Sequence, residues 1–358
     1  MALKILFISR ATLFNQPGGD TVQVEQTAAY LEKLGHQVHI QTGAKPNRKG
    51  PFDIVHFFNL IRPADARYWL LRKVPFIISS IYHDYSEFDQ KQRKGLAHLL
   101  FSLFGKMGVE YFKTIARWLN KTDQFPGIRY LVKGQKRSMQ ELLVKAQALV
   151  TTSQQEINLI KNDLGYVPHC HIIPLGSEHM TPPIDALEKQ GVFCAARIEG
   201  AKNQLQLIHA VQSTSLTLRL SGNAATNQSE YYERCKTAAS KSVTFLGRID
   251  KVALQNEFAK AKTHALISYY ETTGLSTLEA LANGCQVVIT NRGAQPEIFG
   301  EHAFYCDPEN INTIKEALLK ANESNISHQN WVKENFSWVK ATHKISDIYK
   351  QLLNEPNK

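Results

Sequence analysis

The sequence predicts an α/β protein of two domains, each built on a doubly wound parallel sheet. Short apolar runs of strand length alternate with helical patterns along the chain, which is typical of strands joined by crossover helices. Several runs are apolar throughout, as expected for strands buried on both faces of a sheet. The chain has 358 residues, more than one core usually holds, and the polar stretch 177–190 separates two halves of the same style.

The first half, residues 1–178, is predicted to be the N-terminal domain. Its first helix is expected over 21–34, with Asp20 as N-cap and Gln23 completing a capping box. A second capping pair, Ser153 with Glu156, predicts the start of a later helix. The strands of this domain are predicted over residues 3–9, 37–42, 54–58, 76–81, 148–152 and 170–174.

The second half, residues 186–335, repeats this alternation and is predicted to be the C-terminal domain. A helical pattern from Trp331 to Leu353 is interrupted near residues 336–338, so residues 336–358 are assigned to a separate C-terminal helix. The strands of the domain are predicted over 191–196, 216–221, 243–246, 263–268 and 286–290, and its helices near 203–211, 229–240, 252–260, 277–283 and 310–321.

Composition excludes several classes of protein. Hydrophobic residues make up 43% of the chain, as in ordinary globular proteins, and no apolar run reaches the roughly 18 residues of a transmembrane helix. The first nine residues are interpreted as a buried strand rather than a signal peptide. Five cysteines without C-x-x-C spacing argue against a disulfide framework or a zinc site and favour the cytoplasm.

The segment from Glu271 to Gly284 carries the strongest functional signal. Glu271 and Glu279 lie eight positions apart between two predicted strands, and Gly274 and Ser276 between them can start a helix. A helix N-terminus attracts phosphate, whereas carboxylates suit hydroxyl groups. Phosphate beside a polyol points to a nucleotide sugar.

Two cations follow the strand 191–196. Arg197 and Lys202 are placed at the carboxyl end of a parallel strand, where ligands bind in α/β proteins. There they could neutralise a diphosphate and stabilise it as a leaving group. A basic, solvated loop is the alternative.

The two-glutamate pattern, with Gly274 and the run from Glu279 to Gly284, resembles the retaining glycosyltransferases of family 4, the glycosyl transferases group 1. The resemblance covers nearly the whole chain. It implies the GT-B fold, in which two Rossmann-like domains face a central cleft, and a C-terminal helix that crosses back to the N-terminal domain. It also implies transfer of a sugar from a nucleotide-sugar donor to a glycan or lipid-linked acceptor, in bacterial surface polysaccharide or glycoconjugate synthesis.

The resemblance assigns roles residue by residue. Arg197 and Lys202 hold the diphosphate, Glu279 binds the ribose, Glu271 contacts the donor sugar, and His83 faces that sugar after the strand 76–81. Glu271, His83, Arg197 and Lys202 are the implied catalytic residues. The further nucleotide-sugar contacts that it implies are Gly18, Gly19, Gly222, Gly247, Ile249, Gly274, Leu275 and Ser276.

Structural explanations stay open for several of these residues. Ser276 and Glu279 fit a capping box that needs no ligand. His83 could be a structural histidine, and Gly18 with Gly19 could form an ordinary turn. The pair Thr272–Thr273 departs from the apolar or aromatic residue of many relatives, which leaves the identity of the sugar open.

No D-x-D pair stands in a plausible metal position, and Arg197, Lys202 and the helix N-terminus could replace a cation. We therefore expect no metal and no cofactor, and a donor based on UDP or GDP. The resemblance implies retention of configuration. Since no side chain stands out as a nucleophile, we expect front-face return. Two alternatives are a nucleotide-sugar epimerase or hydrolase of the same fold, and a non-enzymatic protein that binds membranes or nucleic acid.

The net charge of +10 is concentrated in one segment. Residues 91–140 hold eleven Lys or Arg against two acids, a net charge of +9, interleaved with aromatic and aliphatic residues. Basic amphipathic helices suit an anionic membrane surface. The alternative is two helices packed on the N-terminal domain with solvated cations, and nucleic acid is not expected as a partner. We thus expect a cytoplasmic protein, with peripheral contact to the inner face of the membrane left open.

Overall fold

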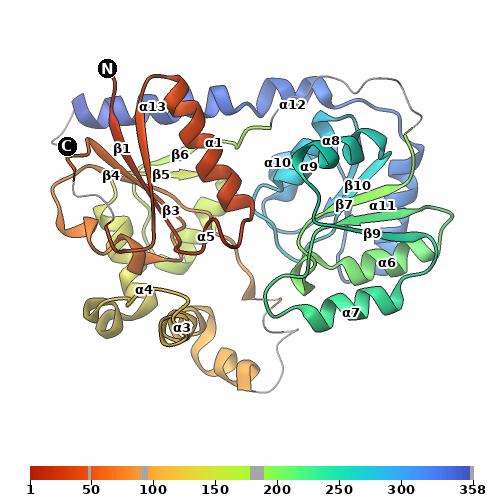
Figure 1. Ribbon diagram of the computed structural model, residues 1–358, viewed down its shortest axis with the longest axis horizontal. Coiled ribbons are helices and arrows are strands. Elements are labelled where there is room, and N and C mark those ends of the chain that lie inside the picture. Colours follow the sequence, from red (N-terminus) through yellow and green to blue (C-terminus); the bar gives the residue numbers. More distant parts are fainter. Residues whose placement is uncertain (47–49, 87, 89, 91–95, 178–188, 355–358) are drawn as a thin grey trace. The chain divides into compact units, whose positions relative to one another are not determined.

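The computed structural model describes residues 1–46, 50–86, 88, 90, 96–177 and 189–354 (Figure 1). The chain forms two compact units. The first unit comprises Met1–Gly176 and Trp338–Lys358, and the second comprises Ser177–Ser337. Each unit contains a six-stranded sheet with parallel pairing throughout and helices on both faces. The predicted α/β class with two doubly wound sheets is confirmed.

The first sheet has the strand order β2-β1-β3-β4-β5-β6. Successive residues of β1 point to opposite faces: Ile5 and Phe7 join one buried cluster, and Leu6 and Ile8 join another. This burial on both faces explains the continuous apolar runs in the sequence. The strands are β1 (Lys4–Ser9), β2 (Gln37–Thr42), β3 (Ile54–Phe58), β4 (Phe76–Ser79), β5 (Ala148–Thr151) and β6 (Cys170–Ile172).

Helices cover both faces of this sheet (Figure 1). α1 (Gly19–Lys33) and α13 (Trp338–Asn354) pack on one face, whereas α4 (Ile128–Lys145) and α5 (Gln154–Leu164) pack on the other. α3 (Leu96–Leu119) packs against α4. The last helix of the chain therefore belongs to the first unit.

The predicted N-cap of α1 is wrong. The cap is Gly18, whose N–H donates to Thr21 Oγ1 at 3.0 Å, and the helix starts two residues earlier than expected. Asp20 instead accepts from Arg10, with Nε and Oδ2 2.5 Å apart. Asp20 lies inside the first turn of the helix, where its Oδ1 also accepts from the Thr21 N–H at 3.0 Å.

Of the two hydrogen bonds of the predicted capping box of α5, the one accepted by the Ser153 side chain is confirmed. Ser153 Oγ accepts from the N–H of Glu156 at 3.1 Å. The Glu156 carboxylate is buried and accepts from Ser80 Oγ at 2.6 Å, the Tyr82 N–H at 2.7 Å and the Thr152 N–H at 2.9 Å. It thereby ties the ends of β4 and β5 together.

The second sheet has the order β12-β11-β10-β7-β8-β9. The short edge strand β12 (Phe304–Cys306) and helix α10 (Gln295–Phe299) were not predicted. The other strands are β7 (Val192–Ala195), β8 (Leu218–Ser221), β9 (Val243–Gly247), β10 (Thr263–Leu266) and β11 (Gln286–Thr290). The other helices are α6 (Gln204–Gln212), α7 (Ser229–Ala238), α8 (Lys251–Lys260), α9 (Leu275–Ala282), α11 (Ile311–Glu323) and α12 (Gln329–Asn335).

The predicted interruption of the C-terminal helical pattern is confirmed, because α12 ends at Asn335 and α13 begins at Trp338. Two buried histidines anchor α13 to the first unit. His56 Nδ1 lies 2.6 Å from Tyr349 Oη, and His36 Nε2 lies 2.8 Å from Ser346 Oγ. These contacts give the helix polar partners as well as an apolar face.

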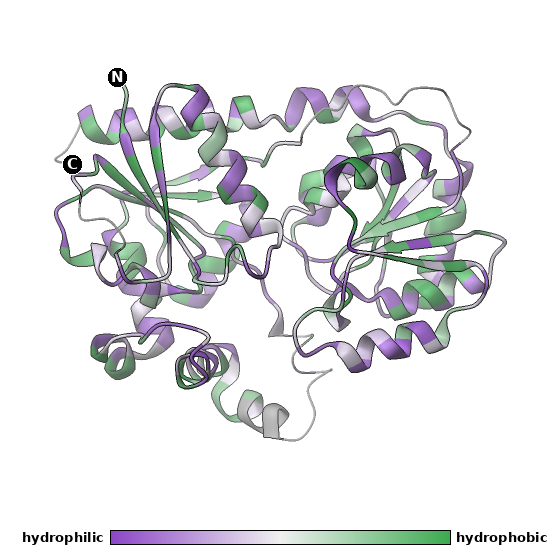
Figure 2. Ribbon diagram, in the orientation of Figure 1, coloured by the Kyte–Doolittle hydropathy of each residue, from purple (hydrophilic) through white to green (hydrophobic). Residues whose placement is uncertain are grey.

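Colouring by hydropathy shows the same arrangement in both units: hydrophobic residues gather on the strands, and the helices carry polar residues on their outer sides (Figure 2). Among the described residues, no helix is both long and apolar enough to span a bilayer.

Candidate functional site

The second sheet has a topological switch point between β7 and β10. The chain runs from β7 to β8 and β9 on one side, and then returns to build β10, β11 and β12 on the other. A switch point at the carboxyl ends of parallel strands is where α/β proteins usually bind their ligands. The predicted site residues Lys202 and Glu271 lie on the loops that follow these two strands.

The structure brings Lys202 and Glu271 into contact. Lys202 Nζ lies 2.5 Å from Glu271 Oε2, and Ser268 Oγ lies 3.3 Å from the same oxygen. The loops are also joined by their backbones, because the Tyr269 N–H donates to Ala201 O at 2.9 Å. A cation and a carboxylate, each expected from the sequence to follow a strand, are thus held together at the switch point.

Gly274 begins the helix beside this pair. It is the N-cap of α9, and its φ of 71° lies in the left-handed region that favours glycine. A Cβ at this position would lie 3.2 Å from Thr277 Oγ1, 3.2 Å from Gln295 Oε1 and 3.6 Å from Glu271 Cγ. The glycine therefore keeps a narrow space open between Glu271 and the start of the helix.

Within the described ranges, no side chain caps α9. The Oγ1 atoms of Thr273 and Thr277 are buried and have no hydrogen-bond partner among the described residues. Buried hydroxyls without partners are uncommon in proteins and call for an explanation such as a ligand. Sequence analysis noted Thr273 only as part of the Thr272–Thr273 departure and did not single out Thr277; their position on either side of Gly274 was the available signal.

The capping-box explanation for Glu279 is wrong. α9 begins at Leu275, so Ser276 and Glu279 are its second and fifth residues and not its N-cap and N3. Glu279 is half-buried on this helix. Its predicted contact with ribose remains a prediction.

Arg197 is not part of the Lys202–Glu271 contact. Its guanidinium is exposed and pairs with Glu199, with Nη2 and Oε1 3.3 Å apart. Its backbone is fixed, because Gln204 Nε2 donates to Arg197 O at 2.8 Å. Arg197 thus lies on the same loop as Lys202, with an exposed side chain, and its predicted role at the diphosphate stays a prediction.

Gly222 and Gly247 end the neighbouring strands β8 and β9. A Cβ on Gly222, whose φ is 139°, would lie 2.0 Å from Ala196 O, so the glycine is required by backbone packing alone. The Gly222 N–H donates to Gly247 O at 2.8 Å. Ile249 packs against a buried cluster of the second unit.

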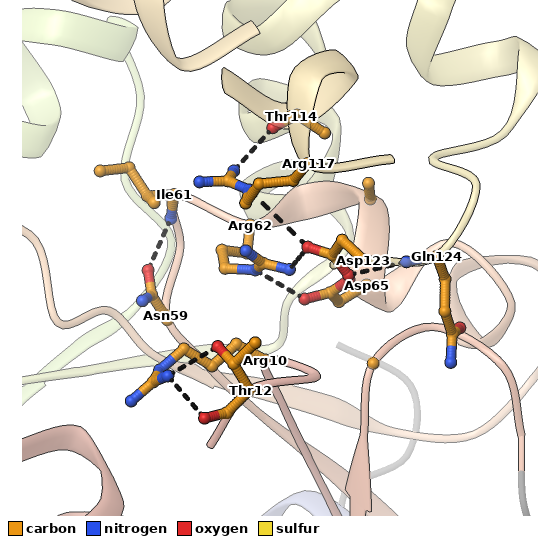
Figure 3. Close-up of polar contacts among 12 residues, drawn as sticks. Arg10, Thr12, Asn59, Ile61, Arg62, Asp65, Thr114, Arg117, Asp123 and Gln124 are labelled. Carbon is orange, nitrogen blue, oxygen red and sulfur yellow. Dashed lines mark hydrogen bonds and ion pairs between the residues drawn. The ribbon is translucent and has the colours of Figure 1, made fainter. Parts of the chain in front are cut away.

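The remaining predicted residues belong to the first unit. Gly18 and Gly19 start α1 after β1, and the β1–β3 pair is the switch point of the first sheet. Arg10 secures this loop by donating to Thr12 O at 2.9 Å and Thr12 Oγ1 at 2.8 Å (Figure 3). His83 follows β4 and is half-buried, with its ring 5.9 Å from that of Tyr85.

A charged network beyond β3 was not predicted. Arg62 lies between Asp65 and Asp123, and Arg117 Nε lies 3.7 Å from Asp123 Oδ2 (Figure 3). Burial alone would lower the pKa of Arg62, but the two carboxylates raise it. The network ties the loop after β3 to the connection between α3 and α4, and lines a small cavity with Pro126. In the described ranges, no three His, Cys, Asp or Glu side chains are gathered as metal ligands.

The second unit resembles a known protein family in sequence. The family model "Glycosyl transferases group 1" matches residues 183–338, which contain Lys202, Glu271 and Glu279. The chain is 25% identical over 225 residues to the poly(glycerol-phosphate) alpha-glucosyltransferase of Bacillus subtilis, covering 58% of this chain and 32% of the relative. It is 28% identical over 120 residues to the O-antigen chain mannosyltransferase B of Escherichia coli, covering 31% of this chain and 30% of the relative. The chain thus spans about a third of the length of these relatives.

Solved structures resemble the whole chain. Sucrose-phosphate synthase of Thermosynechococcus elongatus superposes with a TM-score of 0.76 at 16% identity, covering 98% of this chain and 99% of the other. Anabaena HepE in complex with UDP-glucose superposes with a TM-score of 0.69 at 17% identity, covering 98% of this chain and 100% of HepE. The chain has the GT-B fold, and its second unit matches the group 1 glycosyl transferases.

Proposed function

We propose that the protein transfers a sugar from a nucleotide-diphosphate sugar to a glycan or lipid-linked acceptor. The observation that carries the proposal is the contact of Lys202 with Glu271 beside the uncapped start of α9. Positive charge, free helix N-terminus and carboxylate are thereby concentrated at one switch point. A diphosphate linked to a sugar matches all three.

In this proposal, Lys202 and the start of α9 bind the diphosphate. An ammonium group has three donors, so Lys202 can keep Glu271 and still donate to a phosphate oxygen. Glu271, oriented by Lys202 and Ser268, accepts from hydroxyls of the donor sugar. Gly274, Leu275 and Ser276 offer backbone N–H groups at the same helix start.

Arg197 joins the diphosphate by turning away from Glu199. An exposed ion pair contributes only about 0–1 kcal/mol, so a phosphate can displace it at little cost. Glu279 binds the ribose hydroxyls, and the turns at Gly222, Gly247 and Ile249 contact the nucleotide. Gly18, Gly19 and His83 act on the acceptor side.

The reaction that we propose retains the configuration at the anomeric carbon. The bond from that carbon to the phosphate oxygen breaks, and the acceptor hydroxyl oxygen bonds to the same face. The acceptor proton passes to the leaving phosphate, and the nucleoside diphosphate departs. Lys202, Arg197 and the helix start supply the positive charge, so we propose a reaction that needs no metal.

The comparisons support a hexose donor and a bacterial surface polymer as acceptor. One relative is a glucosyltransferase acting on poly(glycerol-phosphate), another is a mannosyltransferase of the O-antigen, and HepE binds UDP-glucose. We propose UDP or GDP as the nucleotide and the cytoplasm as the place of reaction.

Release of nucleoside diphosphate tests the function. UDP-glucose and GDP-mannose are incubated with the protein, with and without poly(glycerol phosphate) or O-antigen fragments. Acceptor-dependent release supports transfer, and the anomeric configuration of the product reports retention. Consumption of donor without any acceptor would instead identify a hydrolase or epimerase. Failure to consume any donor with any acceptor would count against the proposal.

A further inference from the structure

Apolar side chains lie exposed along one side of α3. Phe112, Ala116 and Leu119 are all exposed and are spaced at i, i+4 and i+7, which places them on one face of the helix. Leu119 is 64% exposed. Residues 91–95 of the basic segment, and the side chains of residues 96–100, lie outside the described part of the chain.

The neighbouring helix α4 carries a second exposed pair. Ile128 and Val132 are 72% and 80% exposed and lie one turn apart. The two helices pack together through other residues: Tyr111 Oη donates to Leu131 O at 2.9 Å, and the Tyr111 and Tyr130 rings stack at 5.6 Å. Leu119, Ile128 and Val132 take no part in these two contacts and stay exposed to solvent.

The acidic side chains of this region are buried. Glu110, Asp123 and Glu141, the three acids of residues 101–145, have side chains that are only 8%, 7% and 15% exposed. Each is paired with a cation inside or at the edge of the helical pair. The carboxylates therefore form ion pairs within the protein and add little negative charge to its surface.

Several cations of this region, in contrast, face solvent. Lys121, Lys136 and Arg137 are exposed and form no ion pair with the described residues. Arg129 and Lys145 are also exposed beside Glu141. The outer surface of α3 and α4 consequently combines positive charge with bare apolar side chains, and lies on the face of the first sheet opposite α1 and α13 (Figure 1).

We infer that α3 and α4 dock on an anionic lipid surface. Apolar side chains flanked by Lys and Arg are the combination that inserts at a lipid interface while the cations contact phosphate headgroups. A second copy of the same surface would be repelled by its own cations, and nucleic acid would make no use of exposed Leu, Ile and Val. The docking is peripheral, since no described helix is long and apolar enough to span a bilayer.

Vesicle cosedimentation tests the inference. The full chain is mixed with vesicles of phosphatidylcholine alone or of phosphatidylcholine with phosphatidylglycerol. Two variants are compared: L119S/I128S/V132S removes the three most exposed of these large apolar side chains, and K121Q/K136Q/R137Q removes three cations that are unpaired among the described residues. The matched controls V252S/I326S and K241Q/K333Q change equally exposed residues of the second unit. Circular dichroism establishes that every variant is folded.

We expect binding to the anionic vesicles only, a loss of at least about tenfold in both test variants, and no loss in the controls. Equal binding to both vesicle types, no binding by the wild type, or unchanged binding by L119S/I128S/V132S would overturn the inference. Retention by duplex DNA instead of vesicles would do so as well. K202A should bind vesicles as the wild type does, which separates this inference from the proposed sugar transfer.

Discussion

Lys202 and Glu271 are 69 positions apart in the sequence, yet Nζ of the first lies 2.5 Å from Oε2 of the second. The strand order causes this proximity. β7 and β10 are neighbours at the switch point of the second sheet, so the loops that leave their carboxyl ends start side by side. A backbone hydrogen bond from Tyr269 to Ala201 then fixes the two loops to each other.

Removing either member of this pair should impair catalysis far more than folding. We expect Lys202→Ala and Glu271→Gln each to lower kcat/KM by about 100-fold or more, because each removes a charge aligned with the donor. Steady-state nucleoside diphosphate release measures the effect. Lys241→Ala, at an exposed position of the same unit, is the control. Near-normal kcat/KM in both site variants would show that the pair is merely structural.

Gly274→Ala should lower both stability and donor affinity. The new Cβ would be strained at a φ of 71° and crowd Thr277 and Gln295. Gly35→Ala is the matched control, because its φ is 86° and its Cβ would meet no atom within 4 Å. Backbone strain should lower the free energy of unfolding of both variants by about 1 kcal/mol. The crowding of the new Cβ should lower that of Gly274→Ala further. Urea unfolding and donor titration measure these effects; equal behaviour of the two variants would contradict the narrow space assigned to Gly274.

Thr277→Val should leave the free protein as stable as the wild type, or up to about 1 kcal/mol more stable, because its buried hydroxyl has no described partner. Thr342→Val is the control: that buried hydroxyl donates to Trp338 O at 2.7 Å, and its loss should cost about 1 kcal/mol. Urea unfolding compares the two. A clear destabilisation by Thr277→Val would mean that the hydroxyl is bonded in the free protein.

Acid should loosen the attachment of α13. Burial lowers the pKa of His56 from 6.5 to about 3, so between these values the unfolded chain binds the proton and the folded chain does not. Stability is therefore lost as the pH falls through that window, by about 2 kcal/mol from about pH 7.5 to about pH 5. His56→Gln should lack this part of the pH dependence, whereas the exposed His209→Gln should keep it. Parallel stability curves for wild type and His56→Gln would refute the assignment.

The sequence predicted those elements whose signal is local. β2, β3 and β11 occupy the predicted residues because each is a bounded run of strand-forming side chains. β12 was missed because three residues at a sheet edge give too short a run. The start of α1 was misplaced because its N-cap is Gly18, which has no side chain that signals a cap in the sequence.

The same limit applies to the site. Motif and spacing were enough to nominate Lys202, Glu271 and Gly274 as site residues. Their mutual contact could not be predicted in this way, because it depends on strand order and not on separation in the chain. The hydroxyls of Thr273 and Thr277, which lack a partner among the described residues, left no pattern in the sequence because their significance lies in burial. The network around Arg62 left none because its partners come from distant segments.

The most direct test of the central claim is a thermal-shift comparison of wild type and Lys202→Ala with UDP-, GDP-, ADP- and TDP-sugars. We predict that at least one UDP- or GDP-sugar raises the Tm of the wild type, by the equivalent of about 2.7 kcal/mol at a hundredfold excess over Kd, and that Lys202→Ala loses most of this shift. No shift of the folded wild type with any nucleotide sugar, or an equal shift in the variant, would contradict the claim that Lys202 and Glu271 form a nucleotide-sugar site.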